Sequence, residues 1–151
     1  YQENQISLIY DTMWDGTRML AENIAKGIKQ ADDAVTVKLF NISRRDINDV
    51  VTEVFKSKAI LLGSPTINKG ILNAMSALIE MVTGLKFKNK KAAAFGCYGW
   101  SGESVKLLTE HLNRAGFAVV DEGLKTLWQP GEEELSRARD FGKDFVAKIK
   151  G

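Results

Sequence analysis

The chain has 151 residues, a formal net charge of +2 at pH 7 and one cysteine. This length suits a single domain with a substantial buried core, and so small a charge does not point to nucleic acid as a partner. No apolar run approaches the roughly 20 residues that a membrane-spanning helix needs, so we expect no membrane partner. A lone cysteine excludes an internal disulfide and fits a reducing compartment, so we expect a cytoplasmic protein.

The N-terminal residues 1–5 lack the basic and then apolar layout of a signal peptide. The first residue is tyrosine and not methionine, and a strand is expected almost at once. We therefore expect one domain over residues 1–151 that is a fragment of a longer chain, although processing would give the same start.

In the first half of the chain, apolar runs typical of strands alternate with segments whose apolar residues recur every four positions. A continuous apolar run predicts a strand buried on both faces, and recurrence every four residues marks one face of a helix. The predicted elements are, in order, a strand at residues 6–10, a helix with Leu20, Ile24 and Ile28 on one face, a strand at 35–40, a short helix near 48–55 and a strand at 59–63.

The second half continues the alternation and ends on a long helix. Gly116 is expected to stop the helix before the last strand. The predicted elements are a helix with Met75, Leu78, Ile79 and Val82 on one face, a strand at 91–95, a helix with Val105, Leu108, Leu112 and Ala115, a strand at 119–127, and a helix with Leu135, Ala138, Gly142, Phe145 and Ile149.

Five strands that alternate with five helices predict an α/β fold with a parallel sheet. Right-handed crossovers place helices on both faces of such a sheet. Ligands then bind at the carboxyl ends of the strands, near the switch point of the strand order. The loops after the first, third and fourth strands are therefore the candidate site.

The first of these loops, residues 11–17, has the sequence Asp-Thr-Met-Trp-Asp-Gly-Thr and leads directly into a helix. Backbone N–H groups converge at a helix N-terminus, and the helix dipole favours a dianion there. Thr12 and Thr17 would donate from their hydroxyls, and Gly16 would let the backbone come close. The loop has no lysine and is not a Walker A loop. The loop alone equally allows that Thr17 only caps the helix.

The other two loops differ in how unusual they are. Residues 64–70, Ser-Pro-Thr-Ile-Asn-Lys-Gly, offer small polar groups but also suit an ordinary strand-to-helix turn. Residues 96–102, Gly-Cys-Tyr-Gly-Trp-Ser-Gly, hold three glycines and two aromatic residues, which suits stacking on a planar ring. The alternative is that Trp100 folds back onto the core. Together the three loops predict a phosphate cradle and an aromatic clamp at one edge of the sheet.

Residues 12–17 resemble the phosphate loop of the flavodoxin superfamily, Thr/Ser-x-Thr-Gly-x-Thr. The outer hydroxyls match, whereas Trp14 and Asp15 replace the middle Thr-Gly. The chain is similar in particular to the flavodoxin-like domain of flavodiiron proteins. The segments that carry this second resemblance, in order along the chain, are residues 10–13, 63–66, 81–87, 95–96, 99–102 and 115–117.

The resemblance implies a flavodoxin-like three-layer sandwich, with a five-stranded parallel sheet of order 2-1-3-4-5 and helices on both faces. It also implies one FMN, with the phosphate on the first loop and the isoalloxazine between the other two. The candidate cofactor-binding residues are Thr12, Met13, Trp14, Asp15, Gly16, Thr17, Ser64, Pro65, Thr66, Ile67, Asn68, Gly70, Gly96, Cys97, Tyr98, Gly99, Trp100, Ser101 and Gly102.

For function, the resemblance implies an electron-transfer domain that relays electrons to a diiron domain of the metallo-β-lactamase-like class, in the same or a partner chain. That domain would reduce dioxygen or nitric oxide, a rubredoxin or similar protein would be the electron donor, and the full-length protein would be a homodimer. A diiron site needs several histidines, and this chain has one. We therefore expect no metal and no catalytic residue within the chain.

Three other classes of protein share parts of this pattern. A free-standing flavodoxin carrier has the same fold, but such carriers are usually strongly acidic and this chain is slightly basic. A flavodoxin-like quinone reductase typically carries insertions, and none is evident here. A phospho-receiver domain needs an aspartate at the end of the third strand, and residues 61–64 offer none.

A few further residues allow two interpretations each. The only histidine, His111, is expected at the surface or at a helix cap, with a catalytic base or a metal ligand as the alternative. Cys97 and Trp128 are expected to pack in the protein, with contact to the cofactor as the alternative. A cluster of lysines is expected to form a solvated turn before a strand, with a patch for an acidic partner as the alternative. These lysines are Lys86, Lys88, Lys90 and Lys91.

Overall fold

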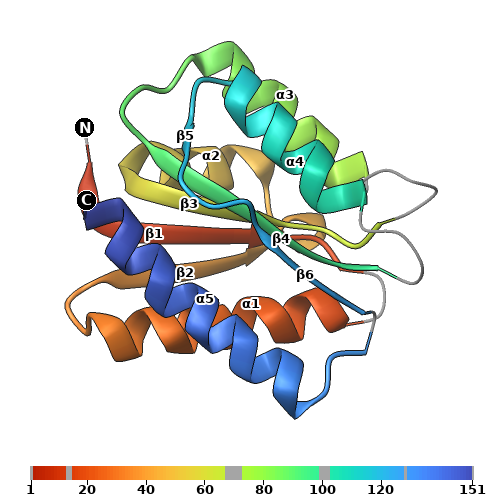
Figure 1. Ribbon diagram of the computed structural model, residues 1–151. Coiled ribbons are helices and arrows are strands. Elements are labelled where there is room, and N and C mark those ends of the chain that lie inside the picture. Colours follow the sequence, from red (N-terminus) through yellow and green to blue (C-terminus); the bar gives the residue numbers. More distant parts are fainter. Residues whose placement is uncertain (1, 13–14, 67–72, 99–102, 128, 151) are drawn as a thin grey trace.

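The computed structural model describes residues 2–12, 15–66, 73–98, 103–127 and 129–150. Figure 1 shows a central sheet with helices on both faces, as the sequence predicts. In chain order the elements are β1 (Glu3–Tyr10), α1 (Gly16–Ala31), β2 (Thr36–Asn41), the 3-10 helix η1 (Ile42–Arg44), α2 (Ile47–Lys56), β3 (Ser57–Gly63), α3 (Asn73–Leu85), β4 (Lys91–Tyr98), α4 (Glu103–Arg114), β5 (Ala118–Val119), β6 (Leu124–Leu127) and α5 (Glu132–Lys150).

The strands pair in the order β2-β1-β3-β4-β5, and every pair is parallel. This order confirms the predicted 2-1-3-4-5 arrangement. The register aligns Leu8 of β1 with Leu61 of β3, and Leu61 with Ala93 of β4. Side chains of successive strand residues point to opposite faces, so each of these central strands contributes to the core on both sides of the sheet.

The last strand differs from the prediction of one strand over residues 119–127. It is divided into β5 and β6, which pair with successive parts of β4. Between them Gly123 has a φ of +103°, and its N–H donates to the Asp121 carboxylate at 2.8 Å. A Cβ at Gly123 would lie 2.8 Å from the carbonyl oxygen of Ala94. The close approach of this turn to β4 therefore interrupts the strand.

The two faces of the sheet carry separate hydrophobic cores. Helices α1 and α5 cover one face, and α2, α3 and α4 cover the other (Figure 1). Alternate residues of β1 show the division, because Leu8 packs toward α1 and α5 whereas Ile9 packs toward α2, α3 and α4. None of the helices in the described residues combines the length and apolarity that crossing a membrane requires.

Helices α1 and α5 pack against each other at two glycines. A Cβ at Gly142 would lie 2.3 Å from the carbonyl oxygen of Ile24, and one at Gly27 would lie 1.9 Å from that of Arg139. Either distance is too short for a side-chain carbon, so the two backbones can approach this closely only because both residues are glycine.

The lysine cluster is only partly the predicted solvated turn. Lys86 and Lys88 are exposed, but Lys90 is 3% exposed. Its ammonium donates to the carbonyls of Phe55 at 2.8 Å and Ser57 at 2.6 Å, and it lies over the rings of Phe55 and Phe87. The prediction was therefore wrong for Lys90, because carbonyls at the junction of α2 and β3 hold its charge inside the fold.

Candidate cofactor-binding site

The carboxyl ends of β1, β3 and β4 lie at one edge of the sheet, where the three candidate loops begin, because these neighbouring strands are parallel (Figure 1). Hydrogen bonds continue past the strand ends and join these loops. The N–H of Asp11 donates to the carbonyl of Gly63 at 2.9 Å, and the N–H of Thr66 donates to that of Cys97 at 2.9 Å. These bonds join the start of the first loop to the end of β3, and the start of the second loop to the end of β4.

The Thr12 hydroxyl lies at this edge. Its Oγ1 is buried and has no hydrogen-bond partner among the described residues, while its own N–H donates to the Asp11 carboxylate at 3.0 Å. A buried polar group without a partner costs about 1–3 kcal/mol. A phosphate oxygen at this position would remove that cost, so the residue fits the group that the sequence predicts.

The start of α1 leaves its backbone donors available to an anion. Asp15 occupies the N-cap position, but its side chain makes no capping hydrogen bond, and no acidic residue lies in the first turn. The Asp15 side chain is instead 68% exposed and pairs with Arg18 at 3.4 Å. The helix N-terminus therefore keeps its affinity for a dianion.

The structure describes two residues of the first loop, Thr17 and Asp15, for which the sequence raised a question. Thr17 does not cap the helix, because α1 begins at Gly16 and places Thr17 inside the first turn, where it is 1% exposed. Asp15 stands where the superfamily motif has glycine, and its φ of 64° is a left-handed conformation that glycine adopts most easily. The loop keeps the glycine-like backbone although the residue is aspartate.

The second and third loops are held together through the start of α4. The N–H of Ser104 donates to the Thr66 hydroxyl at 3.1 Å, and its own hydroxyl donates to the Ser64 carbonyl at 2.9 Å. A Cβ at Gly96 would lie 2.3 Å from that same carbonyl oxygen. Ser104 was not among the predicted site residues, because a serine in the first turn of a helix is also typical of ordinary helix starts.

Cys97 and Tyr98 end β4 at this edge with different exposures. The Cys97 thiol is buried, lies 3.8 Å from the Thr126 hydroxyl and pairs with the Thr17 side chain. Burial raises the pKa of this thiol. This supports packing as the role of the Cys97 side chain. Tyr98 is half-buried.

Other predicted residues fall outside the part of the chain that the structure describes, and Trp128 is one of them. Pro65 and Ser64 are described and both are buried. The predicted site residues outside the described ranges are Met13, Trp14, Ile67, Asn68, Gly70, Gly99, Trp100, Ser101 and Gly102.

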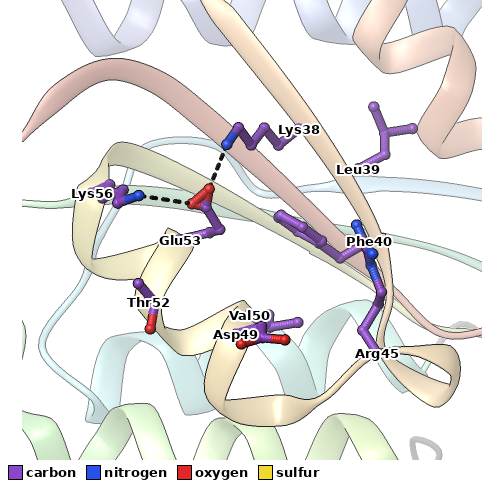
Figure 2. Close-up of a pocket in the computed structure, with 9 residues that line it drawn as sticks. All are labelled: Lys38, Leu39, Phe40, Arg45, Asp49, Val50, Thr52, Glu53 and Lys56. Carbon is purple, nitrogen blue, oxygen red and sulfur yellow. Dashed lines mark hydrogen bonds and ion pairs between the residues drawn. The ribbon is translucent and has the colours of Figure 1, made fainter.

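A cavity of about 540 Å³ lies away from these loops, between β2 and α2 (Figure 2). Figure 2 shows Glu53 between Lys38, at 2.5 Å, and Lys56, at 3.8 Å. The hydrogen bond from Lys38 lowers the pKa of Glu53. The lowered pKa and the two ion pairs favour the ionised form of Glu53, which joins α2 to the edge strand β2.

His111 lies in the last turn of α4 and is half-buried. It lines a cavity of about 330 Å³ between α3 and α4, together with Glu80 and Arg114. Among the described residues, no group of three or more histidine, cysteine, aspartate or glutamate side chains is arranged to hold a metal ion. His111 therefore belongs to the cavity between α3 and α4, and not to a metal-binding group of the described residues.

The fold and this edge together define a flavodoxin-like domain. The flavodoxin family model matches residues 8–142, and the chain therefore belongs to the flavodoxin family, for which the cofactor is FMN. A curated relative, the anaerobic nitric oxide reductase flavorubredoxin of Pectobacterium carotovorum, is 45% identical over 146 residues, which are 97% of this chain and 29% of that relative.

Solved structures give the same result. The rubredoxin oxygen:oxidoreductase of Desulfovibrio gigas matches with a TM-score of 0.91 and 30% identity, over 98% of this chain and 36% of its own. The flavodiiron protein of Giardia intestinalis matches with a TM-score of 0.89 and 27% identity, over 97% of this chain and 36% of its own. An archaeal flavodoxin matches with a TM-score of 0.84 and 27% identity, over 97% of this chain and 99% of its own.

These comparisons confirm the predicted resemblance to the flavodoxin-like domain of flavodiiron proteins. The chain spans less than a third of the curated relative and about a third of the two larger structures. It corresponds to one part of those proteins, whereas it corresponds to nearly the whole of the archaeal flavodoxin.

Proposed function

We propose that this FMN-binding electron-transfer domain relays electrons to a diiron domain of the metallo-β-lactamase-like class, in the same or a partner chain. The match over 97% of this chain to a flavorubredoxin more than three times as long carries this proposal. That relative is an anaerobic nitric oxide reductase, which supports nitric oxide as the final substrate. Dioxygen is the alternative that the rubredoxin oxygen:oxidoreductase supports.

The described residues at the sheet edge fit FMN. The Thr12 hydroxyl, which has no partner within the described part of the chain, and the first N–H groups of α1 suit its phosphate, and Asp15 is turned to solvent and paired with Arg18. The loops that begin at Ser64 and Gly96 would flank its ring. When bound, FMN supplies the one-electron redox chemistry that protein side chains lack. This chain then binds it, orients it and holds it at an exposed edge.

The electron donor in this proposal is a rubredoxin or similar protein. The names flavorubredoxin and rubredoxin oxygen:oxidoreductase, which belong to the two matched proteins, support this choice. The full-length protein would act as a homodimer, as the resemblance to flavodiiron proteins implies.

The second candidate function is a free-standing flavodoxin carrier. The archaeal flavodoxin favours it, because this chain covers 99% of that protein. The net charge of +2 favours the tethered domain, since a domain joined to its acceptor needs less long-range electrostatic attraction.

Identification of the bound flavin tests the foundation of the proposal. The purified chain, incubated with FMN and FAD together, should retain FMN on gel filtration and release it on denaturation. The first loop cradles a single terminal phosphate and lacks the Gly-x-Gly-x-x-Gly sequence typical of pyrophosphate sites. Retention of FAD, or of no flavin, would refute the FMN assignment.

A further inference from the structure

Asp11 is a buried carboxylate at the edge where the phosphate is expected. It directly follows β1, is 3% exposed and comes immediately before Thr12. A carboxylate near a dianion raises the electrostatic cost of binding. An acid in this place therefore calls for a role that outweighs the repulsion.

The contacts of Asp11 indicate what that role is. Its Oδ1 accepts from the N–H of Thr12 at 3.0 Å and from the hydroxyl of Ser43 at 2.5 Å. Ser43 belongs to η1, and its N–H donates to the Asn41 side chain at 3.1 Å. The N–H of Asp11 itself donates to Gly63 at 2.9 Å. The residue is thus fixed from the ends of both neighbouring strands, β2 and β3.

This arrangement determines what Thr12 can offer to a ligand. The Thr12 N–H donates to the Asp11 carboxylate, so the hydroxyl is the donor that Thr12 can offer to a ligand. This hydroxyl is buried and has no partner among the described residues. Hydrogen-bond donors that are held in place before a ligand arrives lower the cost of ordering the site.

We propose that Asp11, held by Ser43, is a positioning residue for the cofactor phosphate: it fixes the Thr12 backbone so that the Thr12 hydroxyl faces the anion. The inference rests on the proposed FMN-binding function. Asp11 itself does not bind the phosphate. Its carboxylate oxygen acts as a hydrogen-bond acceptor, and the negative charge is a cost that the positioning outweighs.

Riboflavin separates this role from general stability, because it has the same ring as FMN but no phosphate. The experiment measures the dissociation constants of FMN and riboflavin by flavin fluorescence for the chain and for the variants Asp11→Ala, Asp11→Asn and Ser43→Ala. Asp32→Ala is the matched control, because Asp32 makes the same kind of bond, to the N–H of Ala34 at 3.1 Å, at the far end of α1. Circular dichroism confirms that each variant is folded.

Asp11→Ala should weaken FMN binding by about tenfold or more, because without the carboxylate the Thr12 hydroxyl no longer lies where it can donate to the charged phosphate. Riboflavin binding should change by less than about twofold, since the ring contacts remain. Asp11→Asn keeps an acceptor oxygen without the charge and should bind FMN within about threefold of the unmodified chain. Ser43→Ala should fall between the two aspartate variants, and Asp32→Ala should match the unmodified chain.

An unchanged preference for FMN over riboflavin in Asp11→Ala and Ser43→Ala would overturn the positioning role. So would an equal loss of both flavins, which indicates a general structural role. If Asp11→Ala does not fold, Asp11→Asn and Ser43→Ala decide. A loss of FMN affinity of about tenfold or more in Asp11→Asn, with riboflavin affinity unchanged, would then contradict the inference. An unmodified chain that binds both flavins equally would instead refute the proposed phosphate cradle.

Discussion

At the residue scale, the first loop offers polar groups to a ligand. The Thr12 hydroxyl is buried and finds no hydrogen-bond partner among the described residues, and the first turn of α1 carries no acidic side chain. Leaving such groups unsatisfied lowers stability, and it is the usual cost of preparing a site for a charged ligand. Substitutions at Thr12 and Asp15 therefore separate ligand binding from stability.

Thr12→Val replaces the hydroxyl by a methyl group of the same shape. The free energy of unfolding without cofactor should rise by about 1 kcal/mol, because a buried unsatisfied group is removed, while FMN should bind about tenfold more weakly. Thr109→Val is the matched control, since the Thr109 hydroxyl is also buried and unpartnered among the described residues but lies in α4. It should stabilise the chain and leave FMN affinity unchanged. Urea unfolding and flavin titration measure both quantities, and unchanged FMN affinity in Thr12→Val would contradict the assignment.

Asp15→Gly restores the residue type of the superfamily motif at a left-handed position, where φ is 64°. The free energy of unfolding should rise by about 0.5–1 kcal/mol, because glycine adopts this conformation without strain. FMN binding should also tighten, because a negative charge leaves the edge. Asn89→Gly, at φ 61° on a distant turn, should give the same stability gain without a change in FMN affinity. Weaker FMN binding by Asp15→Gly would count against the account of this loop.

At the scale of elements, the contact between α1 and α5 depends on the absence of side-chain atoms. Gly142→Ala would place a Cβ 2.3 Å from the Ile24 carbonyl, and the resulting overpacking should lower the free energy of unfolding by about 1–3 kcal/mol. Gly84→Ala, in α3, meets no atom within 4 Å and should stabilise by about 0.5–1 kcal/mol. Urea denaturation of both variants tests the packing, and equal effects of the two would contradict it.

The junction of α2, β3 and β4 depends on the buried Lys90. Burial lowers the pKa of its ammonium below the ordinary 10.5. Between the lowered pKa and 10.5 the unfolded chain binds more protons than the folded chain, so the contribution of Lys90 to the free energy of unfolding rises with pH. Lys90→Met removes that contribution along with the bonds to Phe55 and Ser57.

The free energy of unfolding of the unmodified chain should therefore exceed that of Lys90→Met by a growing margin as the pH rises through the alkaline range. This difference is the stability gap. Urea unfolding at a series of pH values measures the gap, and other titrating groups cancel in the difference. Lys88→Met is the control for removing a lysine from the same turn, because Lys88 is exposed. A gap that narrows with pH would show that the charged form of Lys90 is favoured inside the fold.

At the scale of the whole molecule, the fold was largely predictable because each central strand is buried on both faces. Continuous apolar runs such as residues 59–63 and 92–95 therefore mark β3 and β4 without further information. The division of the last strand was not predictable, since it depends on the approach of Gly123 to the Ala94 carbonyl, which is distant in sequence. The burial of Lys90 has the same kind of cause.

The candidate site was predictable in its location but not in its supporting contacts. Strand order and loop composition place Thr12, Ser64 and Gly96 at one edge of the sheet, and the structure brings these loops together. The contacts made by Ser43 and Ser104 come from other elements. A single serine carries no signal of such a contact, because its partner is set by the tertiary fold.

In the proposed function, this chain carries electrons and reduction takes place on a separate diiron domain. The most direct measurement is nitric oxide consumption by three samples: the chemically reduced chain loaded with FMN, the metal-loaded diiron domain of a flavorubredoxin relative, and the two together. We predict rapid consumption only in the mixed sample, and none when FMN is left out. Rapid consumption by this chain alone, with iron bound in stoichiometric amount, would contradict the claim.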